Sequence, residues 1–336
     1  MLVFASSVPR TSRMGNARFS LLRILADGEV HPADRVRCVL EVSEAGMRKL
    51  VGDLEALGMR VLAEDSGLRL ERPVDLYDAE FVSEQVSRAF PGLRIECLDE
   101  CTSTSTVLAE RARAGAAHGT VLACEHQSDG RGRRGNDWFS AVGGGITFSV
   151  LWRFARGAGV LTGLSLAVAV GAAKALESLG AREVGVKWPN DLLCGTGKLG
   201  GILVETAGDA AGPVAAVVGV GVNYRLDGAA RERIARPVTD IATCCGEMPS
   251  RSVALAKLVS HVASSLEGFS REGFAAFRLA WLERHAWQGR RVVLSQADRS
   301  VAEGRVVGIA DDGALELASE RGIQRFHSGE LSLRLG

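Results

Sequence analysis

The stretch KWPNDLLCGTGKLGGILVE, from Lys187 to Glu205, contains the pattern from which the fold can be read. Its second half, residues 198–205, opens with a lysine and continues into an apolar run, which predicts a buried strand. Similar runs predict strands at residues 120–124, 145–152 and 214–223, and longer patterns predict helices at residues 161–179, 253–269 and 274–287. Most of these strands are joined by loops rather than by regular crossover helices, so we predict an α+β central domain.

The segments on either side of this central region have different patterns. Residues 16–72 predict three short helices followed by a hairpin, which is the pattern of a winged helix-turn-helix domain. Residues 73–91 are expected to form a linker with a short helix, and residues 92–287 form the central α+β domain. Residues 288–336 carry five short strands with glycine turns, including Asp312-Gly313, and we predict a small SH3-like β-barrel there.

Composition limits the classes of protein that this chain can belong to. It has 336 residues, enough for two or three domains, and 40 basic and 40 acidic residues, so binding to nucleic acid or membrane would need a local patch. Seven scattered cysteines without a CxxC pair argue against a disulfide framework or a zinc site and indicate a reducing cytoplasm. The longest apolar runs are too short to span a membrane, which predicts a cytoplasmic protein. Met14 is an alternative start to Met1, because patterned sequence begins just after it.

A loop rich in glycine and arginine, GRGRRG at residues 130–135, follows a predicted strand. Alternating glycines let main-chain N–H groups approach an anion, and arginines supply forked donors, so we interpret the loop as a phosphate or carboxylate site. From these residues alone, a flexible basic loop or an RNA contact is the alternative. The loop is not a Walker loop, because no GK[ST] follows, and the glycine spacing is wrong for a dinucleotide-binding fingerprint.

Two further motifs carry lysines. In KWPND, Lys187 stands near Asn190 and Asp191, and the ammonium group with these oxygen ligands can handle a phosphate and its Mg²⁺. Lys198 opens the next strand, where a pair of glycines lets a ligand approach the backbone. In isolation, the first motif also fits an ordinary strand end, and the second fits a solvated lysine at a strand edge.

A cluster of hydroxyl side chains, residues 102–106, precedes a predicted helix at residues 107–113. These groups can cap the helix or hydrogen-bond a small polar ligand, and capping is the simpler interpretation. Farther along, GVGVN ends a buried strand with the amide of Asn223.

The order of these motifs is more specific than any one of them. The hydroxyl cluster, Gln127 with GRGRRG, KWPND, KLGGILVE and GVGVN follow one another in a way that resembles the biotin–protein ligases. The predicted N-terminal and C-terminal domains make the resemblance closest to the bacterial bifunctional ligases that also repress the biotin operon. It covers roughly residues 16–336 and is most specific in the catalytic block. It implies an enzyme that uses ATP, Mg²⁺ and biotin to modify a biotin carboxyl carrier domain of acetyl-CoA carboxylase.

The resemblance also implies a set of site residues. The expected catalytic cations are Lys198, Arg131, Arg133 and Lys187. The residues expected to contact biotin or the nucleotide are Ser103, Thr104, Ser105, Gln127, Arg131, Gly132, Arg133, Trp138, Lys187, Asn190, Asp191, Lys198, Gly200, Gly201 and Asn223. Asp191 is in addition the expected metal ligand. The family's Asp-Ser-Thr-Asn is Thr-Ser-Thr-Ser here, at residues 102–105, so the roles of its Asp and Asn do not carry over directly.

The mechanism implied by the resemblance is governed by charge. The carboxylate of biotin attacks the α-phosphorus of ATP, and two unit charges about 4 Å apart repel by about 4 kcal/mol at an effective dielectric constant near 20. Fixed cations offset this repulsion and stabilise the transition state. The product, biotinyl-5'-AMP, is hydrolysed by water, so a loop is expected to close over it. An acceptor lysine then attacks the carbonyl and AMP leaves, without an enzyme nucleophile.

DNA binding by the N-terminal domain needs its own case. The residues expected to bind DNA are Ser43, Arg48 and Lys49. Ser43 is also expected to cap the third helix, and Arg48 and Lys49 are expected to meet DNA phosphates. Glu44 beside them and the acidic turn at residues 64–65 oppose binding to an acidic backbone. Operator binding is one interpretation, and a regulatory domain that packs on the ligase is the other.

Two alternative functions stay open. A lipoate or octanoate ligase shares the expected fold and chemistry, but GRGRRG, KWPND and the C-terminal barrel favour the biotin branch. A biotin-sensing transcription factor without catalysis would not need all four expected catalytic cations. The resemblance further implies a ligand-dependent homodimer paired through the central sheets, and no membrane partner.

Overall fold

The structure of the chain is a computed structural model, which describes residues 16–155, 157–208, 213–234, 236–296, 299–328 and 331–335. Met14, the alternative start, lies outside the described residues. The chain divides into two compact units, Met1–Val74 and Asp75–Gly336. None of the helices in the described ranges has the length and apolar character needed to cross a bilayer.

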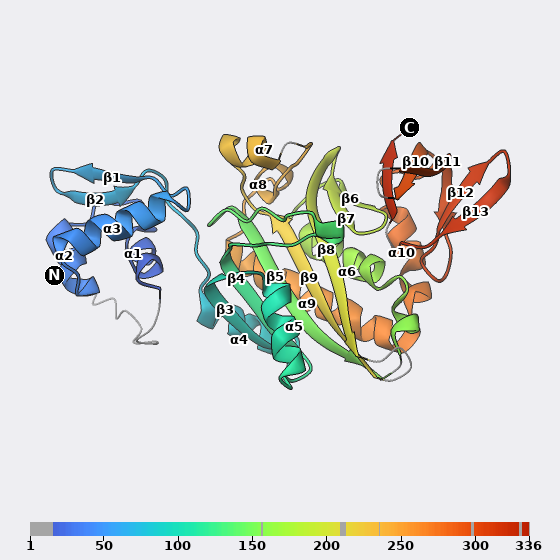
Figure 1. The fold of residues 1–336 in the computed structure, drawn as a ribbon, viewed down its shortest axis with the longest axis horizontal. Coiled ribbons are helices and arrows are strands. Elements are labelled where there is room, and N and C mark those ends of the chain that lie inside the picture. The colour runs from blue at the N-terminus through green and yellow to red at the C-terminus, as the bar shows by residue number, and fades with distance from the viewer. Residues whose placement is uncertain are drawn as a thin grey trace. The chain divides into compact units, whose positions relative to one another are not determined.

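The first unit consists of three helices and a hairpin, as predicted (Figure 1). Its elements are α1 (Ala17–Leu25), α2 (Ala33–Leu40), α3 (Glu44–Glu55) and the antiparallel strands β1 (Val61–Glu64) and β2 (Gly67–Leu70). Each helix buries one apolar face, and Phe19, Leu22 and Leu54 are fully enclosed. The hydroxyl of Ser43 caps α3 by accepting a hydrogen bond from the main-chain N–H of Gly46.

A seven-stranded sheet forms the centre of the second unit, in the order β3-β4-β5-β9-β8-β7-β6. Its strands are β3 (Arg94–Cys101), β4 (Thr120–Gln127), β5 (Gly145–Phe154), β6 (Val184–Lys187), β7 (Asp191–Cys194), β8 (Gly197–Gly208) and β9 (Val214–Asn223). Only β3 and β4 run parallel among the described neighbours. The four predicted strands are all present. β3, β6 and β7 were not predicted, because they are short or interrupted by charged residues.

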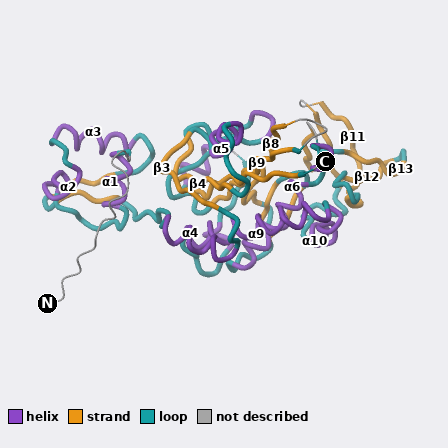
Figure 2. The backbone as a smooth tube through the Cα atoms, turned by 90° about the horizontal axis from the view of Figure 1, so that it is seen from below, coloured by secondary structure: helices purple, strands orange, loops and turns teal. Residues whose placement is uncertain are grey.

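Helices cover both faces of this sheet. α4 (Ala79–Ala89), α6 (Leu164–Ser178) and α9 (Arg251–Glu272) pack on one face, and α5 (Thr104–Arg113) packs on the other (Figure 2). α7 (Gly228–Ile234) and α8 (Ile241–Cys244) lie in the connection between β9 and α9. α4 is the short helix that was expected within the linker at residues 73–91, but its Val82 and Val86 are buried in the central core. This segment therefore belongs to the packed body of the second unit.

The chain ends in a five-stranded antiparallel sheet, in the order β13-β12-β11-β10-β14, which agrees with the five predicted strands. These are β10 (Arg291–Gln296), β11 (Arg299–Ile309), β12 (Leu315–Ser319), β13 (Gly322–Phe326) and β14 (Leu331–Leu335). The helix predicted just before it is shorter, because a 3-10 turn, Phe274–Phe277, leads into α10 (Arg278–Glu283). Val292, Leu294 and Val306 share one core with the central sheet, so the C-terminal sheet is packed against the central domain.

Candidate functional site

Three glycines on neighbouring strands leave one part of the central sheet without side chains. Along β9, the residues on the face covered by α5 become smaller, from Ala215 and Val217 to Gly219 and Gly221. Gly201 on β8 is the register partner of Gly221, so it lies on the same face. We call Gly201, Gly219 and Gly221 the glycine floor, and the candidate site is built on it.

Side chains from separate segments meet over the glycine floor. A Cβ atom added to Gly219 would lie 2.5 Å from Oγ of Ser105, at the start of α5. A Cβ atom added to Gly221 would collide with the indole ring of Trp138, which follows the arginine loop. The missing side chains therefore let two predicted site residues, far apart in the sequence, approach the same patch of backbone.

The hydroxyl cluster at the start of α5 forms a buried polar wall. Ser103 is the N-cap residue of α5, but its side chain makes no capping hydrogen bond within the described part of the chain, so capping does not account for it. The hydroxyls of Thr104 and Ser105 lie 2.8 and 2.9 Å from Oγ of Ser149 on β5. The main-chain N–H of Thr104 donates to Oε1 of Gln127 over 2.7 Å. All of these side chains are buried, so their orientation is set by the network rather than by solvent.

Lys187 and Lys198 both bind the carboxylate of Asp191. Nζ of Lys198 lies 2.5 Å from Oδ1, and Nζ of Lys187 lies 3.3 Å from Oδ2. Burial alone would raise the pKa of Asp191, but the charges of the two lysines outweigh it, and the pKa lies below its ordinary value. Burial lowers the pKa of Lys187, and the charge of Asp191 restores only part of it. A Cβ atom at Gly201 would lie 3.5 Å from Nζ of Lys198, so this cation cluster (Lys187, Asp191 and Lys198) borders the glycine floor.

Aromatic and amide side chains hold the KWPND turn in place. Nζ of Lys187 lies 4.4 Å from the ring centroid of Trp287, a cation–π contact that the sequence did not reveal. Trp188 is fully buried, and its Nε1 donates to the main-chain carbonyl of Gly313, in the turn between β11 and β12 of the C-terminal sheet. Nδ2 of Asn190 donates to a main-chain carbonyl of β8 over 2.8 Å. The turn is thus a rigid support for Lys187.

The arginine loop, residues 130–135, spans the distance from α5 to the C-terminal sheet. Nη1 of Arg131 lies 3.5 Å from Oγ1 of Thr106 on α5. Arg133 donates to Oδ1 of Asn190 over 3.4 Å and to the main-chain carbonyl of Ser328 over 3.2 Å. The loop also lines a cavity of about 680 Å³, together with the start of α6, residues 202–205 of β8 and Ser328. Both predicted arginines are therefore placed beside an open volume.

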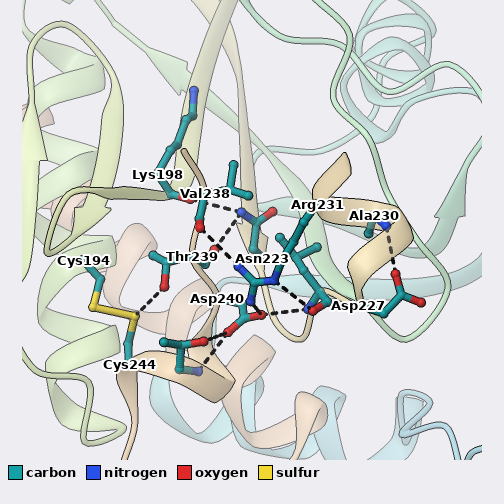
Figure 3. Close-up of polar contacts among 12 residues, drawn as sticks. Cys194, Lys198, Asn223, Asp227, Ala230, Arg231, Val238, Thr239, Asp240 and Cys244 are labelled. Atoms are coloured by element: carbon teal, nitrogen blue, oxygen red, sulfur yellow. Dashed lines mark hydrogen bonds and ion pairs between the residues drawn. A yellow bond between two sulfur atoms is a disulfide. The ribbon is translucent and has the colours of Figure 1, made fainter. Parts of the chain in front are cut away.

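Asn223, at the end of β9, contacts the main chain beneath the cation cluster. Its Nδ2 donates to the main-chain carbonyls of Lys198, over 3.2 Å, and of Thr239, over 2.9 Å (Figure 3). The side chain is 5% exposed. In this structure the amide therefore supports the backbone at Lys198.

Two predicted glycines also have supporting positions. A Cβ atom on Gly200 would lie 2.6 Å from the main-chain oxygen of Gly221, so Gly200 serves the packing of β8 on β9. The N–H of Gly132 donates to the carbonyl of Asn136 over 2.7 Å and closes the arginine loop. Neither glycine belongs to the glycine floor.

Cys194 and Cys244 form a disulfide bond, which the sequence did not predict. Cys194 ends β7 and Cys244 ends α8, 50 residues later, and their Cα atoms are 6.5 Å apart. The argument against disulfides from cysteine spacing is therefore wrong for this pair, because the fold, not the spacing, brings the two residues together. Across the described residues, no group of three or more His, Cys, Asp or Glu side chains could hold a metal ion.

Two buried polar groups that support the site were missed at the sequence level. Ser149 hydrogen-bonds to the hydroxyl cluster. The one feature of the sequence that could have indicated this role is a hydroxyl residue within an otherwise apolar strand. Arg251 on α9 is fully buried, with Nη1 2.6 Å from Oε2 of Glu125 and its guanidinium 4.1 Å from the ring centroid of Tyr77. Glu125 stands two residues before Gln127 on β4, so this buried pair anchors the strand that presents Gln127.

In the first unit, the predicted DNA contacts are already paired with carboxylates. Arg48 forms an ion pair with Glu44, one turn earlier on α3. Nζ of Lys49 lies 2.7 Å from Oδ2 of Asp53, one turn later. The side chains of Arg48 and Lys49 are both exposed. α3 carries three acidic and two basic residues, so its exposed surface is not a basic stripe.

Comparison with known sequences places these residues in a family context. The sequence model of the Biotin/lipoate A/B protein ligase family matches residues 98–223, and that of the Biotin protein ligase C terminal domain matches residues 289–334. The chain is 32% identical over 316 residues to the Bifunctional ligase/repressor BirA of Salmonella typhimurium, covering 94% of this chain and 97% of the relative. It is 34% identical over 215 residues to the Biotin--[acetyl-CoA-carboxylase] ligase of Paracoccus denitrificans, covering 63% of this chain and 88% of the relative.

A solved structure is similar in fold to nearly three quarters of this chain. It is the biotin protein ligase from Aquifex aeolicus in complex with biotin and ATP. The TM-score is 0.63 at 29% sequence identity, over 72% of this chain and 99% of that chain. The shared part thus comprises nearly all of that protein.

Proposed function

Because the chain belongs to the biotin protein ligase family, we propose that it is an ATP-dependent biotin–protein ligase. It first converts biotin and ATP into biotinyl-5'-AMP and pyrophosphate, and then transfers the biotinyl group to a lysine of an acceptor protein. The acceptor is a biotin carboxyl carrier domain, in line with the relative that is named as a biotin–[acetyl-CoA-carboxylase] ligase.

The observation that carries the proposal is the cation cluster at the border of the glycine floor. Two lysines around one carboxylate leave a net positive charge beside the glycine floor, over which Ser105 and Trp138 lie. Biotin's carboxylate and the α-phosphate of ATP are both anions, and their mutual repulsion amounts to about 4 kcal/mol at contact distance. Lys198, supported by Lys187, offsets this repulsion and stabilises the negative charge that develops on the oxygens of the α-phosphate.

The glycine floor suits biotin. Biotin's fused ring system joins a polar ureido ring to an apolar thioether ring, and the apolar part needs an aromatic neighbour, which Trp138 supplies over the floor. The polar end of the ring needs oriented hydrogen-bond partners, and Ser103, Thr104 and Gln127 form a buried polar wall beside the floor. Ser105 stands where the family has an asparagine, and its bond to Ser149 gives it a supporting role.

The nucleotide is assigned to the groups around the arginine loop. The cavity of about 680 Å³ is lined by Arg131 and Arg133, and forked guanidinium donors match phosphate oxygens. Mg²⁺ enters as part of the MgATP substrate. Asp191 was also predicted to bind the metal. Both of its carboxylate oxygens bind lysine ammonium groups here, and this geometry does not favour a metal at the same oxygens.

In the second half-reaction the acceptor lysine is the nucleophile, so the enzyme's task is to keep water away from biotinyl-5'-AMP. Biotinyl-5'-AMP is a mixed anhydride, and the arginine loop stands where it can cover that anhydride. The acceptor lysine attacks the carbonyl carbon, and AMP leaves with the electrons of the C–O bond. Lys198 and the arginines then hold the AMP phosphate as its charge returns.

We extend the proposal to the parts outside the catalytic core. The first unit is a winged helix-turn-helix domain with an operator-binding role, because the relative matched over 97% of its length is named a bifunctional ligase/repressor. The C-terminal sheet is an SH3-like barrel. The active repressor is a ligand-dependent homodimer. The paired charges of Arg48 and Lys49 make DNA binding the weaker half of the proposal.

The test is an acceptor-mass experiment. The purified chain is mixed with MgATP, biotin and a biotin carboxyl carrier domain, and the intact mass of the acceptor is followed with time. The proposal expects a gain of one biotinyl group, which Lys198→Ala slows by at least about a hundredfold because the central cation is lost. A matched control, Lys257→Ala, removes a lysine of α9 outside the site and leaves the rate unchanged.

The alternative functions predict different results in the acceptor-mass experiment. A gain with lipoate or octanoate and a matching carrier, but none with biotin, would assign the chain to lipoyl transfer, which the matched family model also includes. Tight biotin binding without pyrophosphate release or acceptor modification would leave a sensor without chemistry. Either result overturns the proposed ligase.

A further inference from the structure

Asp240, in the connection between β9 and α9, is a buried carboxylate with four hydrogen-bond donors (Figure 3). Its Oδ1 accepts from the N–H and the hydroxyl of Thr243, over 2.8 and 2.6 Å. Its Oδ2 accepts from the N–H of Leu226 over 2.8 Å and from Nη2 of Arg231 over 2.6 Å. The residue is 1% exposed. Asp240 therefore closes the connection into a compact loop.

Arg231 extends this network to the segment at residues 237–239. Its Nη1 donates to the main-chain carbonyl of Val238 over 3.2 Å. Val238 in turn forms a parallel bridge with Lys198. The N–H of Lys198 donates to the carbonyl of Pro237 over 3.1 Å, and its carbonyl accepts from the N–H of Thr239 over 3.0 Å. Both polar groups of the Lys198 main chain are thus satisfied by the segment that Arg231 holds.

Lys198 depends on this segment because the sheet does not fully enclose it. The ladder between β8 and β9 begins at Gly200, so β9 supplies no ladder partner to Lys198 within the described register. On the other side, the register between β7 and β8 shifts between Leu192 and Leu193, next to the partner of Lys198. Strand residues next to such an irregularity are less constrained by the ladder. The segment at residues 237–239 acts as the missing neighbour strand.

We propose that Asp240 is a positioning residue for the adenylation step. It fixes Arg231 and the segment at residues 237–239, which set the main chain of Lys198 and hence the point at which its ammonium group meets the reacting anions. The inference rests on the proposed function of Lys198 and deepens it. Misplacement of a catalytic group by about 1 Å can lower a rate by up to about a hundredfold, so a carboxylate outside the site can control the chemical step.

The experiment compares Asp240→Ala and Asp240→Asn with a matched control, Asp227→Ala. Asp227 lies in the same connection and caps α7 by accepting from the N–H of Ala230 over 2.8 Å, but it does not bind Arg231 through its side chain in the described contacts. Asp240→Ala is expected to lower kcat for biotin-dependent pyrophosphate release at least about tenfold, with KM for biotin changed less than about twofold. The isosteric Asp240→Asn loses the ionic bond to Arg231 but keeps the shape, so it falls in between. Asp227→Ala keeps wild-type kcat.

A second measurement does not depend on activity. Hydrogen–deuterium exchange, read by mass spectrometry, reports on the N–H groups of Lys198 and Thr239, which donate across the bridge. Peptides that contain these residues are expected to exchange faster in Asp240→Ala and in Arg231→Ala, and at the wild-type rate in Asp227→Ala. The double variant Asp240→Ala/Arg231→Ala is expected to lose no more kcat than Asp240→Ala alone, because both act through one link.

The outcomes separate the two proposals. If the wild-type chain releases no pyrophosphate with biotin, the proposed function fails, and the exchange at Lys198 and Thr239 still decides whether Asp240 positions them. Unchanged exchange in Asp240→Ala would overturn the inference whatever the activity. Loss of kcat and a matching rise in KM, or additive losses in the double variant, would also overturn it, because a general loosening of the fold has that pattern.

Discussion

Nε1 of Trp188 donates a hydrogen bond to the main-chain carbonyl of Gly313, 3.3 Å away, and this bond joins the KWPND turn to the C-terminal sheet. Trp188 is fully buried and directly follows Lys187, so the cation cluster is supported by a sheet that supplies none of its members. Gly313 also touches the main chain just before α6, because a Cβ atom on it would lie 2.8 Å from Cα of Gly163. The C-terminal sheet is therefore part of the support of the site.

Gly313→Ala tests this support. Gly313 has a φ of +84°, and an added Cβ atom would meet the backbone of Gly163, which cannot move easily. We expect a loss of unfolding free energy of about 2–3 kcal/mol, from backbone strain and from the collision together. The Trp188 bond shifts as well, so kcat for pyrophosphate release falls. Urea unfolding and a pyrophosphate assay measure the two effects.

The matched control is Gly322→Ala at the start of β13. Gly322 has a similar φ of +89°, but an added Cβ atom would meet nothing within 4 Å. It is expected to lose only about 1 kcal/mol from backbone strain and to keep the wild-type kcat. Equal losses of stability and activity in both variants would show that docking at Gly313 does not support the site.

Asp191→Asn is expected to change the pH dependence of the reaction as well as its rate. The charge of Asp191 raises the pKa of Lys187 against the effect of burial, so removing the charge lowers that pKa further. Lys187 then loses its proton at a lower pH, and the alkaline limb of the kcat profile moves to lower pH. The rate at neutral pH falls about tenfold or more, because the two lysines now repel each other. Pyrophosphate release measured across the alkaline range gives the limb directly.

Lys187→Arg is the complement to this variant. A guanidinium keeps its charge at all accessible pH values, so the alkaline limb should move to higher pH or vanish. A limb that stays in place in both variants would mean that Lys187 is not the group that titrates.

The sequence predicted the members of the site better than their arrangement. Lys187 and Lys198 were both expected to be catalytic, but their shared bond to Asp191 depends on the hairpin of β6, β7 and β8 and on its register shift. Asp191 was therefore expected to bind a metal rather than two lysines. A register shift of one residue depends on packing that no local pattern records.

Contacts between distant segments were beyond the reach of sequence patterns. The ring of Trp287 contacts Lys187, and Cys194 is bonded to Cys244. In each pair the two residues are far apart in the sequence, and only the fold brings them together. The α+β class and the strands β4, β5, β8 and β9 of the central sheet could be predicted, because apolar runs of adequate length are a local property. β6 and β7 could not, because each has only four residues, and β3 could not, because charged residues interrupt its apolar pattern.

His285 gives the folded chain a stability that depends on pH. Burial lowers the pKa of His285 to about 4 from an ordinary 6.5, while its hydrogen bond to Gln288 opposes this only in part. The folded state keeps the ring neutral as the pH falls below 6.5, whereas the unfolded state takes up a proton, so acid favours unfolding. This group should account for about 2 kcal/mol of unfolding free energy lost between about pH 7.5 and about pH 5.

The measurement is urea unfolding at both pH values, for the wild-type chain and for His285→Asn. The variant loses stability at the higher pH, because the ring no longer packs on Trp281 at a centroid distance of 4.3 Å. Its further loss at the lower pH should be about 2 kcal/mol smaller than that of the wild type. His327→Asn, at an exposed histidine, should keep the wild-type difference. A wild-type slope in His285→Asn would show that other groups cause the acid sensitivity.

The Cys194–Cys244 bond should contribute to stability in proportion to the loop that it closes. For a separation of 50 residues, loop entropy predicts up to about 4 kcal/mol. Cys194→Ser/Cys244→Ser, or a reducing agent, should therefore lower Tm, and the reducing agent should have no further effect on the double variant.

Alkylation of the denatured, unreduced chain should label five of its seven cysteines. Cys38→Ser, at an exposed free cysteine, should leave Tm unchanged, and seven labels before reduction would rule out the bond.

The ion pairs on α3 predict how DNA binding can be strengthened. Glu44 holds Arg48, so Glu44→Gln frees a guanidinium for a phosphate contact. Each added contact steepens the slope of log K against log salt concentration by about 0.9, so this variant should bind DNA from upstream of biotin-synthesis genes more tightly and with a steeper salt dependence.

Glu55→Gln removes the same charge from the same helix without touching either ion pair, and it controls for the change in net charge. Equal slopes in the two variants would mean that Arg48 does not reach the DNA. If neither variant nor the wild type binds at about 50 mM salt with biotin and ATP present, the operator role fails, because phosphate contacts are strongest at low salt and supply a large share of the affinity.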